Sequence, residues 1–373
     1  MPSVVRAAVM TGVGQPLEVC QVELEAPRGH EVMVRLAASG VCHSDLSMQD
    51  GTMMAPTPIV LGHEGAGVVE QVGAGVSAVQ PGDHVVIAWV PQCGSCFFCQ
   101  RGQRHLCEQA NVVLASGGLL DGSPRFSSGG RPLYQMVAAG TFSEFTVVPE
   151  SGVVKVDDDL DLGVAALIGC AVLTGVGAAT RTAHISEGDS VAVVGCGGVG
   201  LNVVQGARLA GADQVIAVDM SPAKLDLARQ FGATATVDGS DANPVSRVME
   251  LTAQRGTDVS FEVVGLQRSI DQTIAMTRRG GQAVLVGIPK MDVMVQVPAF
   301  LGAVMAAKTI TGCWYGSADV GRDVPRIVEH YVNGELKLDE LVSATIALDQ
   351  VNEAFEAMKA GGVARSVIRY GAS

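Results

Sequence analysis

The stretch "SVAVVGCGGVGLNVVQGARLAGADQVIAVDMSPAKLD", residues 190–226, decides the fold of this chain. It begins with an apolar run at 191–194, which predicts a fully buried strand. Three glycines follow in the pattern G-x-G-x-x-G. A helical stretch then runs to about Ala210, and a second strand at 214–218 ends in Asp219. This order, with strand before and helix after the glycines, predicts a βαβ unit that binds a dinucleotide.

The three glycines each meet a physical need of such a site. Gly195 allows the tight turn, Gly197 lets the backbone approach a pyrophosphate, and Gly200 permits close packing of helix on strand. The pyrophosphate then rests at a helix N-terminus, where free N–H groups favour an anion. Asp219 accepts hydrogen bonds from ribose hydroxyls and repels a 2′-phosphate, so the sequence predicts NAD in preference to NADP.

Further strand-like runs follow this unit, and most are separated by helical stretches. They predict six parallel strands and one doubly wound sheet, an α/β Rossmann domain over roughly residues 172–314. The additional strands are expected at 233–238, 259–265, 282–288 and 309–316.

The flanking residues differ in character. Residues 1–171 are rich in Gly and Pro with short alternating runs, which predicts an irregular, mainly antiparallel β domain. Residues 315–373 end in the strand-like SVIRY and are expected to return to that domain.

The charge and hydropathy of the chain indicate which partners it is not expected to bind. The net charge is −13, with 25 Lys and Arg against 38 Asp and Glu. Such a surface repels phosphate backbones, so nucleic acid and anionic membranes are not expected as partners. Residues 162–180 carry no charge and approach the length of a membrane span, but their glycines and alanines favour a buried inter-domain helix. The N-terminal MPSVVRAAVM does not resemble a signal peptide, so we expect a cytoplasmic protein.

A second stretch, "PQCGSCFFCQRGQRHLC" at 91–107, holds four of the nine cysteines. In a reducing compartment, clustered cysteines bind metal or react more often than they form disulfides. The C-x2-C-x2-C-x7-C spacing favours structural zinc over an iron–sulfur cluster, whose run would continue C-x3-C-P. The expected ligands are Cys93, Cys96, Cys99 and Cys107. Four protein ligands leave no open position, so the chemistry must lie elsewhere.

Three other potential ligands, Cys42, His63 and Cys170, lie outside that lobe. By spacing alone, a lone buried cysteine is usually a small apolar core residue, and a histidine after glycine is often a turn residue. With CHSD at 42–45, GHE-x2-G at 62–67, the four-cysteine lobe, GCGGVG at 195–200 and ARSVI at 364–368, however, the chain resembles a zinc-containing alcohol dehydrogenase of the medium-chain dehydrogenase/reductase superfamily. The resemblance covers essentially the whole length and implies a GroES-like fold for the flanking catalytic domain.

The insert between Cys107 and 141–148 also resembles the long-insert branch of this family. GLLDGSPRF at 118–126 and KVDDDL at 155–160 are most similar to its nitrosodimethylaniline-dependent members. The glutathione-anchoring acid and arginine of formaldehyde dehydrogenases in this branch fall at Met53 and Asn111. Glutathione is therefore not the expected carrier.

The resemblance assigns roles at the metal. Cys42, His63 and Cys170 match the ligands of a catalytic zinc, and Glu64 matches a carboxylate behind it. Asp45 matches the acid that orients the zinc histidine. Ser44 matches the hydroxyl that takes the alcohol proton, and Ser47 stands where liver-type enzymes have a proton-relaying histidine. Zinc lowers the pKa of a bound alcohol, which then gives hydride to NAD.

The remaining matched positions concern the cofactor and the substrate. His43 stands where many relatives have an arginine on the pyrophosphate. The other cofactor-binding positions, besides the glycines and the acid above, are Thr174, Gly198, Val199, Lys224, Val264, Val286, Ile288, Tyr315 and Arg365. The implied substrate pocket is apolar: Met53, Trp89, Met136, Val137 and Trp314, beside Ile288.

The sequence thus predicts an NAD-dependent alcohol dehydrogenase with one catalytic and one structural zinc per chain. The expected substrate is a primary aromatic or medium-chain aliphatic alcohol, and the expected assembly is a homodimer or homotetramer. Two alternatives remain open: a dehydrogenase of a formaldehyde adduct with a thiol other than glutathione, and a non-catalytic NAD-binding relative.

Overall fold

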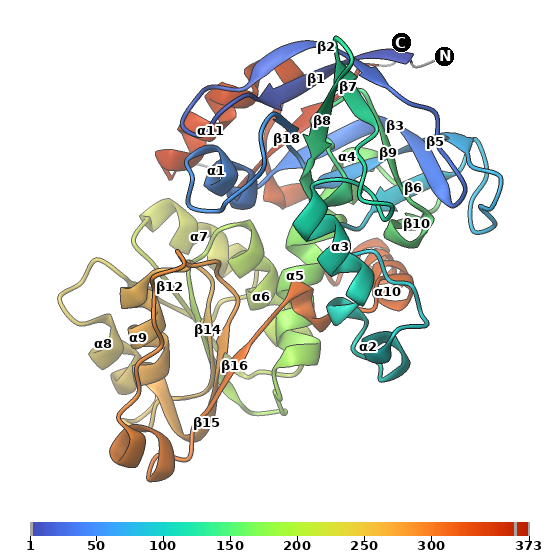
Figure 1. The fold of residues 1–373 in the computed structure, drawn as a ribbon. Helices are drawn as coiled ribbons and strands as arrows, with labels where there is room; N and C mark the ends of the chain where they lie inside the picture. Colours follow the sequence, from blue (N-terminus) through green and yellow to red (C-terminus); the bar gives the residue numbers. More distant parts are fainter. Residues whose placement is uncertain (1–2, 362–363, 372–373) are drawn as a thin grey trace. The chain divides into compact units, whose positions relative to one another are not determined.

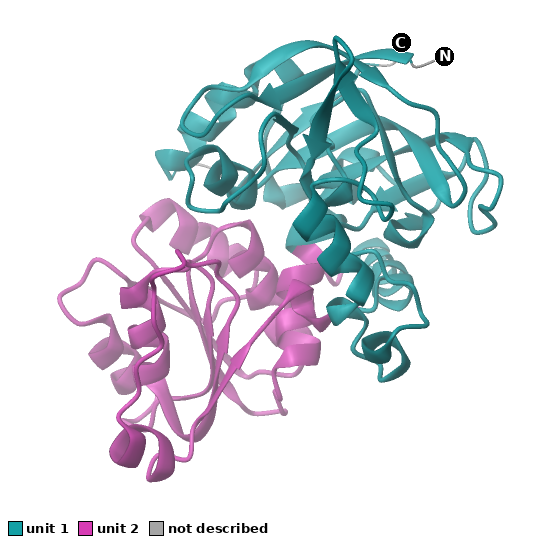
Figure 2. Cartoon of the chain, viewed as in Figure 1, with its two compact units in different colours: residues 1–171, 319–333, 338–373 teal, residues 172–318, 334–337 magenta. Residues whose placement is uncertain are grey.

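The computed structural model describes residues 3–361 and 364–371, which form two compact units (Figure 2). Unit 1 comprises Met1–Ala171, Asp319–Asn333 and Leu338–Ser373, and unit 2 comprises Val172–Ala318 and Gly334–Lys337. Residues 1–2, 362–363 and 372–373 of the predicted flanking domain lie outside the described residues. Unit 2 continues past the expected boundary at 314 because the short 3-10 helix η7 (Tyr315–Ser317) packs on the helix α5 (Leu173–Gly177).

Unit 2 contains a six-stranded sheet in the order β13-β12-β11-β14-β15-β16, and every neighbouring pair is parallel. The doubly wound prediction is therefore confirmed. The strands are β11 (Ser190–Val194), β12 (Gln214–Asp219), β13 (Ala235–Asp238), β14 (Thr257–Glu262), β15 (Thr277–Leu285) and β16 (Thr309–Gly312).

Helices connect most of these strands, and α8 packs beside α9 in unit 2 (Figure 1). They are α6 (Gly198–Leu209), α7 (Pro222–Gln230), α8 (Pro244–Leu251), α9 (Gln267–Met276) and the π-helix η6 (Ala299–Val304). Three predicted strands were too long at their C-terminal ends. The strand in the run 259–265 ends at Glu262. The carboxylate of Glu262 accepts from the N–H groups of Val264 and Gly265, and the chain therefore bends into a turn there. The runs 282–288 and 309–316 stop at Leu285 and Gly312.

Unit 1 consists of a closed barrel, β1-β2-β7-β8-β4, and a seven-stranded sheet in the order β10-β6-β5-β3-β18-β17, with β9 also paired to β3. Its pairs are antiparallel except β4–β8 and β17–β18, so the mainly antiparallel prediction is confirmed. The strands are β1 (Ser3–Met10), β2 (Glu18–Leu24), β3 (Glu31–Val41), β4 (Ile59–Val60), β5 (Glu64–Val72), β6 (His84–Ile87), β7 (Phe126–Ser128), β8 (Arg131–Gln135), β9 (Phe145–Pro149), β10 (Val153–Lys155), β17 (Val342–Ile346) and β18 (Arg365–Arg369).

Most helices of unit 1 have fewer than ten residues, whereas α10 has 13. They are α1 (His43–Gln49), α2 (Phe97–Gln100), α3 (Glu108–Ser116), α4 (Leu162–Leu167), α10 (Val320–Val332) and α11 (Val351–Lys359), with 3-10 turns η1 (Arg104–Leu106), η2 (Met136–Ala138), η3 (Glu150–Gly152), η8 (Asp339–Leu341) and η9 (Leu348–Gln350).

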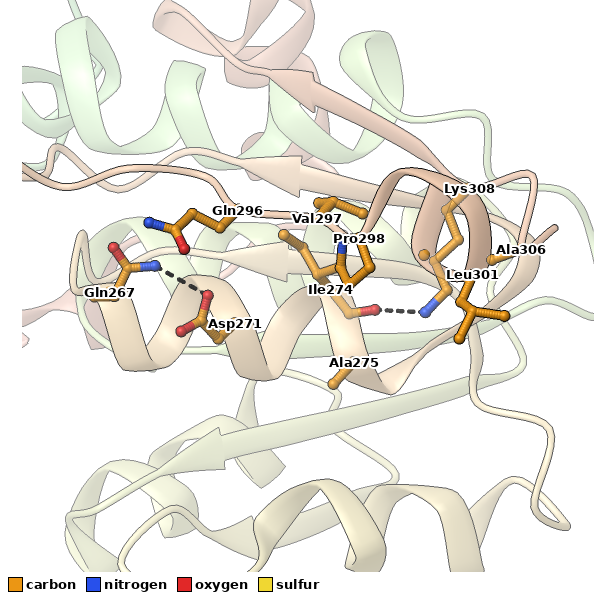
Figure 3. A pocket seen from close by; sticks show the side chains of 11 residues that line it. Gln267, Asp271, Ile274, Ala275, Gln296, Val297, Pro298, Leu301, Ala306 and Lys308 are labelled. Atoms are coloured by element: carbon orange, nitrogen blue, oxygen red, sulfur yellow. Dashed lines mark hydrogen bonds between the residues drawn. The ribbon is translucent and has the colours of Figure 1, made fainter. Parts of the chain in front are cut away.

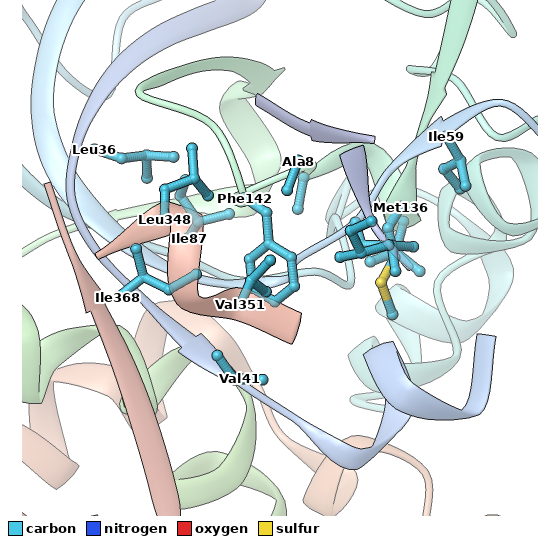
Figure 4. Packing of buried hydrophobic residues seen from close by; sticks show 14 of the residues in the cluster. Ala8, Leu36, Val41, Ile59, Ile87, Met136, Phe142, Leu348, Val351 and Ile368 are labelled. Carbon is cyan, nitrogen blue, oxygen red and sulfur yellow. The ribbon is translucent and has the colours of Figure 1, made fainter. Parts of the chain in front are cut away.

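The main core of unit 1 joins residues from both ends of the chain. Ala8 of β1, Phe142, and Leu348 and Val351 near the C-terminus lie in one buried cluster with Ile368 of β18 (Figure 4). Such burial of apolar surface stabilises the fold by about 25 cal/mol per Å². Because β18 pairs with β3, this core also fixes the strand that leads into α1.

One helical segment, Leu162–Thr182, is long and apolar enough to cross a membrane, and 94% of its apolar window is buried inside the protein. The predicted buried helix is therefore confirmed. It runs through α4, the π-turn η4 (Ile168–Val172), α5 and the π-turn η5 (Ala178–Thr182). Asp161 caps its start by accepting from the N–H groups of Gly163 and Val164. A π-turn is often found at functional sites, and η4 contains Cys170.

Candidate active site

A buried ligand cluster lies in unit 1. Ligand atoms of Cys42, His63, Glu64 and Cys170 all lie within 4.8 Å of one another, and all four residues are buried. Cys42 follows β3, the His63–Glu64 pair stands at the start of β5, and Cys170 comes from the π-turn. Two thiols, an imidazole and a carboxylate match the donor atoms that zinc prefers, so these residues fit the metal.

Asp45 holds two of the predicted ligands in place. Its side chain is fully buried and accepts from the N–H of Cys42 at 2.8 Å and of Gly62 at 3.1 Å. It also lies 3.1 Å from Nδ1 of His63, which leaves Nε2 as the ring nitrogen available to a metal. Burial alone would lower the pKa of His63, but the Asp45 carboxylate and, to a smaller extent, the Cys42 thiolate together offset this, and the pKa is raised well above its usual range.

The sulfurs of Cys42 and Cys170 lie within 4.8 Å of each other. The hydrogen bond with Cys170 lowers the pKa of Cys42 well below its usual range, and the same bond raises the pKa of Cys170. Zinc binds thiolates, so it competes with protons for such a pair.

Arg365, at the start of β18, forms a buried ion pair that sequence reasoning did not predict. Its Nη2 lies 3.1 Å from Oε1 of Glu64 and 3.4 Å from Sγ of Cys42. Burial raises the pKa of Glu64 to about 7, although the Arg365 charge opposes that shift. The guanidinium thus neutralises charge around the ligands within unit 1. Its predicted contact with the cofactor stays a prediction.

Helix α1 carries the expected proton path. Ser44 Oγ lies 3.8 Å from Sγ of Cys42, and Ser47 follows one turn later on the same helix face. Both serines are half-buried, whereas His43 is exposed. The carbonyl of Ser47 accepts from the N–H of Met53, which ties that pocket residue to the helix.

The four unit 1 residues predicted to line the substrate pocket lie in one apolar cluster: Met53, Trp89, Met136 and Val137. The Trp89 ring meets His63 edge-on with centroids 6.4 Å apart. Val137 has φ +45°, which is rare for a β-branched residue and costs of order 1–3 kcal/mol. Trp314 belongs to unit 2, so its predicted part in the pocket stays a prediction.

Hydrogen bonds from the side chains of Gln135 and Thr146 hold the turn that contains Val137. Gln135 is fully buried, accepts from the N–H of Arg125 at 3.2 Å and donates to the carbonyl of Val147 at 3.0 Å. On the other side, Thr146 donates to the carbonyl of Ala139. The residues before and after the strained turn are thus both fastened to β9.

The four-cysteine lobe forms a second ligand cluster. Cys93, Cys96, Cys99 and Cys107 have sulfurs within 4.8 Å of one another, with Cys93 and Cys107 at 3.6 Å. The N–H groups of Cys96 and Cys93 donate to sulfurs of the cluster at 3.3 and 3.4 Å. All nine cysteines are free thiols. This set fits a closed tetrahedral zinc, in agreement with the prediction of a structural site.

The glycine-rich turn in unit 2 has the conformation that a dinucleotide site requires. Gly195 has φ +98°, its N–H donates to the carbonyl of Val218, and Gly197 precedes the first turn of α6. A Cβ on Gly200 would collide with the carbonyl oxygen of Gly195. The predicted residues Gly198 and Val199 begin the helix, so its free N–H groups face the turn.

Asp219 does more than the sequence analysis anticipated. One oxygen accepts from the N–H of Cys196 at 2.8 Å and the other from Ser221 at 2.9 Å. The carboxylate that is expected to bind ribose therefore also fastens the glycine-rich turn to β12. Lys224 lies on α7, just beyond Asp219.

The other predicted cofactor contacts occur at several places. Thr174 is on α5 and Tyr315 in η7, whereas Val264, Val286 and Ile288 follow the C-terminal ends of β14 and β15. The last three lie at the carboxyl edge of the sheet, where ligands of such folds bind. The predicted roles of His43, Thr174, Tyr315 and Arg365 toward the cofactor stay predictions.

Comparisons with known proteins agree with this geometry. A family model described as "Alcohol dehydrogenase GroES-like domain" matches residues 28–158, and one described as "Zinc-binding dehydrogenase" matches 198–332. S-(hydroxymethyl)glutathione dehydrogenase of Escherichia coli O139:H28 is 39% identical over 373 residues, which covers 98% of this chain and 99% of that protein.

Two solved structures are also similar. A zinc-binding-domain alcohol dehydrogenase from Burkholderia ambifaria superposes with a TM-score of 0.94 at 33% identity and covers 100% of both chains. Benzyl alcohol dehydrogenase from Acinetobacter calcoaceticus gives a TM-score of 0.92 at 29% identity, covering 99% of this chain and 100% of the other.

Proposed function

We propose that this chain, which belongs to the zinc-containing alcohol dehydrogenases of the medium-chain dehydrogenase/reductase superfamily, oxidises a primary alcohol to its aldehyde with NAD as the hydride acceptor. The observation that carries the proposal is the buried Cys42–His63–Cys170 set oriented by Asp45. Three ligands that come with a neighbouring carboxylate, and not with a fourth cysteine, are typical of a zinc site with an open position for substrate.

A zinc ion held by Cys42, His63 and Cys170 would lower the pKa of a bound hydroxyl, and NAD would accept the hydride. The chain supplies the proton path: Ser44 is the hydroxyl beside the ligands, and Ser47 is one turn further along α1. Ser47 does not titrate near neutrality, so water or the cofactor ribose must complete the relay.

Asp219 supports NAD over NADP. Its carboxylate is half-exposed at the end of β12, beside the glycine-rich turn. A 2′-phosphate placed there would meet a like charge, whereas ribose hydroxyls would find an acceptor.

The apolar cluster of Met53, Trp89, Met136 and Val137 supports an aromatic or medium-length aliphatic alcohol. The similarity to benzyl alcohol dehydrogenase points in the same direction. A second candidate is the oxidation of a formaldehyde adduct, because the S-(hydroxymethyl)glutathione dehydrogenases are 39% identical. Met53 and Asn111 are uncharged where those enzymes are expected to anchor glutathione, so we infer a different thiol for that candidate.

The test is a panel of alcohols and aldehydes with free NAD and, in parallel, with an artificial electron acceptor. We expect benzyl or medium-chain alcohols to give the highest kcat/KM, and Cys170→Ala to abolish turnover. Low NAD-linked but high acceptor-linked turnover would indicate that NAD stays bound, as in the nitrosodimethylaniline-dependent group. Activity only with S-(hydroxymethyl) thiols would support the second candidate.

We also propose that the chain is a cytoplasmic homodimer that pairs through unit 2. Strand β16 is at the edge of the sheet, and an unpaired edge is open to a second chain. The segment before it exposes large apolar side chains: Met291, Met294, Phe300, Leu301, Val304 and Met305.

A depression of about 580 Å³ lies between α9 and this segment and is lined by Ile274, Val297 and Leu301, with Asp271 and Lys308 at its polar ends (Figure 3). Lys308 donates to the carbonyl of Ile274 at 2.7 Å, so its ammonium group already has a hydrogen-bond acceptor.

Light scattering after gel filtration tests the dimer. Phe300→Glu should give monomers and Val332→Glu, an exposed residue of unit 1, should not; a monomeric wild type would contradict the proposal.

A further inference from the structure

Glu262 carries a fully buried carboxylate for which the sequence predicted no role. It ends β14, where it pairs with Val194 of β11 and Leu285 of β15. Its neighbours on both sides therefore lead directly into the glycine-rich turn and into the segment 286–288. This position is at the carboxyl edge of the sheet, between the strands whose ends carry predicted cofactor contacts.

The side chain of Glu262 organises the turn that follows it. A single oxygen, Oε1, accepts from the N–H of Val264 at 2.9 Å, the N–H of Gly265 at 2.7 Å and Oγ of Ser269 at 2.6 Å. Ser269 in turn accepts from the N–H of Leu266, the N-cap residue of α9. One buried oxygen thus fixes both the β14–α9 turn and the start of that helix.

The main chain of the same residue holds the neighbouring segment. The carbonyl oxygen of Glu262 accepts from the N–H of Val286 at 2.8 Å and of Gly287 at 3.0 Å. The second carboxylate oxygen, Oε2, is buried against Gly287, where a Cβ would come within 2.6 Å of it, and has no hydrogen-bond partner among the described residues. Glu262 therefore joins the two segments that carry Val264 and Ile288.

At Gly265 and Gly195 the neighbouring backbone segments leave no room for a Cβ atom. A Cβ on Gly265 would lie 2.6 Å from the carbonyl carbon of Ile288, and one on Gly195 would lie 2.6 Å from Cγ2 of Val264. Val264 and Ile288 are nevertheless 45% and 43% exposed. Two exposed apolar side chains on closely packed neighbouring segments, at the edge of the sheet where ligands bind, offer an apolar surface to a flat ring.

We propose that Glu262 is a positioning residue for hydride transfer: its carboxylate fixes Val264, its main-chain carbonyl holds the segment that carries Ile288, and these two side chains place the nicotinamide ring, while the adenosine half of the cofactor is held separately by Asp219 and the glycine-rich turn. The inference rests on the proposed function, because it requires NAD to bind at this edge. Loss of the Glu262 carboxylate should therefore disturb binding of the nicotinamide half of the cofactor and leave binding of the adenosine half unchanged.

The test uses Glu262→Gln in the full-length zinc-loaded enzyme. Glutamine keeps one acceptor oxygen, but it lacks the charge that strengthens the three bonds and places an N–H₂ group against Gly287, where Oε2 had no partner. The dissociation constant for NAD should rise about 10-fold while that for ADP-ribose, which lacks nicotinamide, should change less than about 2-fold. The hydride-transfer rate should fall roughly 10- to 100-fold, the scale of a misplaced reactant.

A deuterated alcohol provides the readout that a general loss of stability would not change. The isotope effect on kcat should increase in Glu262→Gln because hydride transfer becomes more rate-limiting. Glu250→Gln, an exposed member of an ion pair on α8 in the same unit, is the matched control and should behave as wild type.

Two results would overturn the inference, and a third would refute the proposed function on which it rests. Equal weakening of NAD and ADP-ribose together with a lower Tm would mean that Glu262 is merely structural. Unchanged NAD affinity and isotope effect would mean that the two segments hold their positions without it. A wild-type enzyme that binds neither ligand would instead refute the NAD assignment in the proposed function.

Discussion

Replacing Asp45 with Asn tests how the protein prepares its catalytic metal site. The carboxylate accepts three hydrogen bonds: from Cys42 N at 2.8 Å, Gly62 N at 3.1 Å and His63 Nδ1 at 3.1 Å. Asparagine has nearly the same shape but only one acceptor oxygen. Whichever way the amide is turned, either the Cys42 N–H or the His63 ring loses its acceptor in a fully buried site.

The expected magnitude follows from that count. One buried donor left without an acceptor costs about 1–3 kcal/mol. At about 1.4 kcal/mol per tenfold change, this corresponds to roughly 10- to 100-fold weaker zinc binding, the range found when the hydrogen-bond partner of a metal-binding histidine is removed. Removing the carboxylate should also lower the pKa of His63, because Asp45 contributes more than Cys42 to raising it.

The assay is a competitive titration of zinc with a chromogenic chelator, which should resolve two ions per chain. In Asp45→Asn the zinc ion of the Cys42–His63–Cys170 site should be released at a roughly 10- to 100-fold lower chelator concentration than in wild type. The zinc ion of the four-cysteine lobe should be released as in wild type. Asp50→Asn, at the exposed end of the same helix, is the control. Two unchanged release steps in Asp45→Asn would refute the argument that this carboxylate prepares the site.

The other predictions concern the metals, the cofactor and the proton path. Cys170→Ala should lose one zinc and all activity with the fold intact by circular dichroism, whereas Cys99→Ala should lose the other zinc and make the 93–107 lobe sensitive to protease; two zincs in Cys170→Ala would contradict the ligand assignment. Asp219→Gly should weaken NAD binding and improve the use of NADP, and an unchanged NADP/NAD ratio of kcat/KM would count against its contact with ribose. Ser44→Ala should lower turnover about 10²–10⁴-fold, the usual worth of a positioned proton acceptor, with zinc content and NAD affinity retained; wild-type turnover would eliminate Ser44 from the proton path.

The sequence predicted most of the fold because its strongest signals are local. The buried run at 191–194, the glycines after it and the acid at 219 lie within one βαβ unit, and the six parallel strands are confirmed. The four-cysteine lobe is also local, and its ligands come together as its spacing indicated. Strand ends were less predictable, because the end of β14 depends on a side chain binding backbone N–H groups beyond it.

The catalytic cluster was less accessible to reasoning from residues alone. Cys42 directly follows β3, His63 directly precedes β5 and Cys170 lies in the π-helical η4, and only the family resemblance connected them in advance. The pair of Arg365 with Glu64 spans 301 positions of the sequence, and no local pattern announces such a contact. The strain at Val137 is likewise invisible in the sequence, because a valine gives no sign of positive φ. The bonds of Gln135 and Thr146, which fasten the two ends of the turn to β9, have no local sequence signal either.

Three carboxylates in this protein share one structural device. Asp45 accepts from the backbone of Cys42 and Gly62, Asp219 from Cys196 and Ser221, and Glu262 from Val264 and Gly265. Each fixes the main chain beside the group that it is expected to serve: a zinc ligand, a ribose or a nicotinamide ring. Charged acceptors form stronger hydrogen bonds to backbone N–H groups than neutral ones, so an acid is well suited to this task.

This dual use has a consequence for interpreting mutants. An alanine or glycine at Asp219 removes the contact with ribose and also releases the glycine-rich turn, because the N–H of Cys196 loses its acceptor. Asp219→Asn separates the two effects, since it keeps an oxygen for Cys196 and removes the charge that repels a 2′-phosphate. If NADP use improves in Asp219→Asn while NAD binding falls less than in Asp219→Gly, the charge sets the cofactor preference and the hydrogen bonds set the affinity. If both variants behave alike, the backbone anchor contributes nothing to binding.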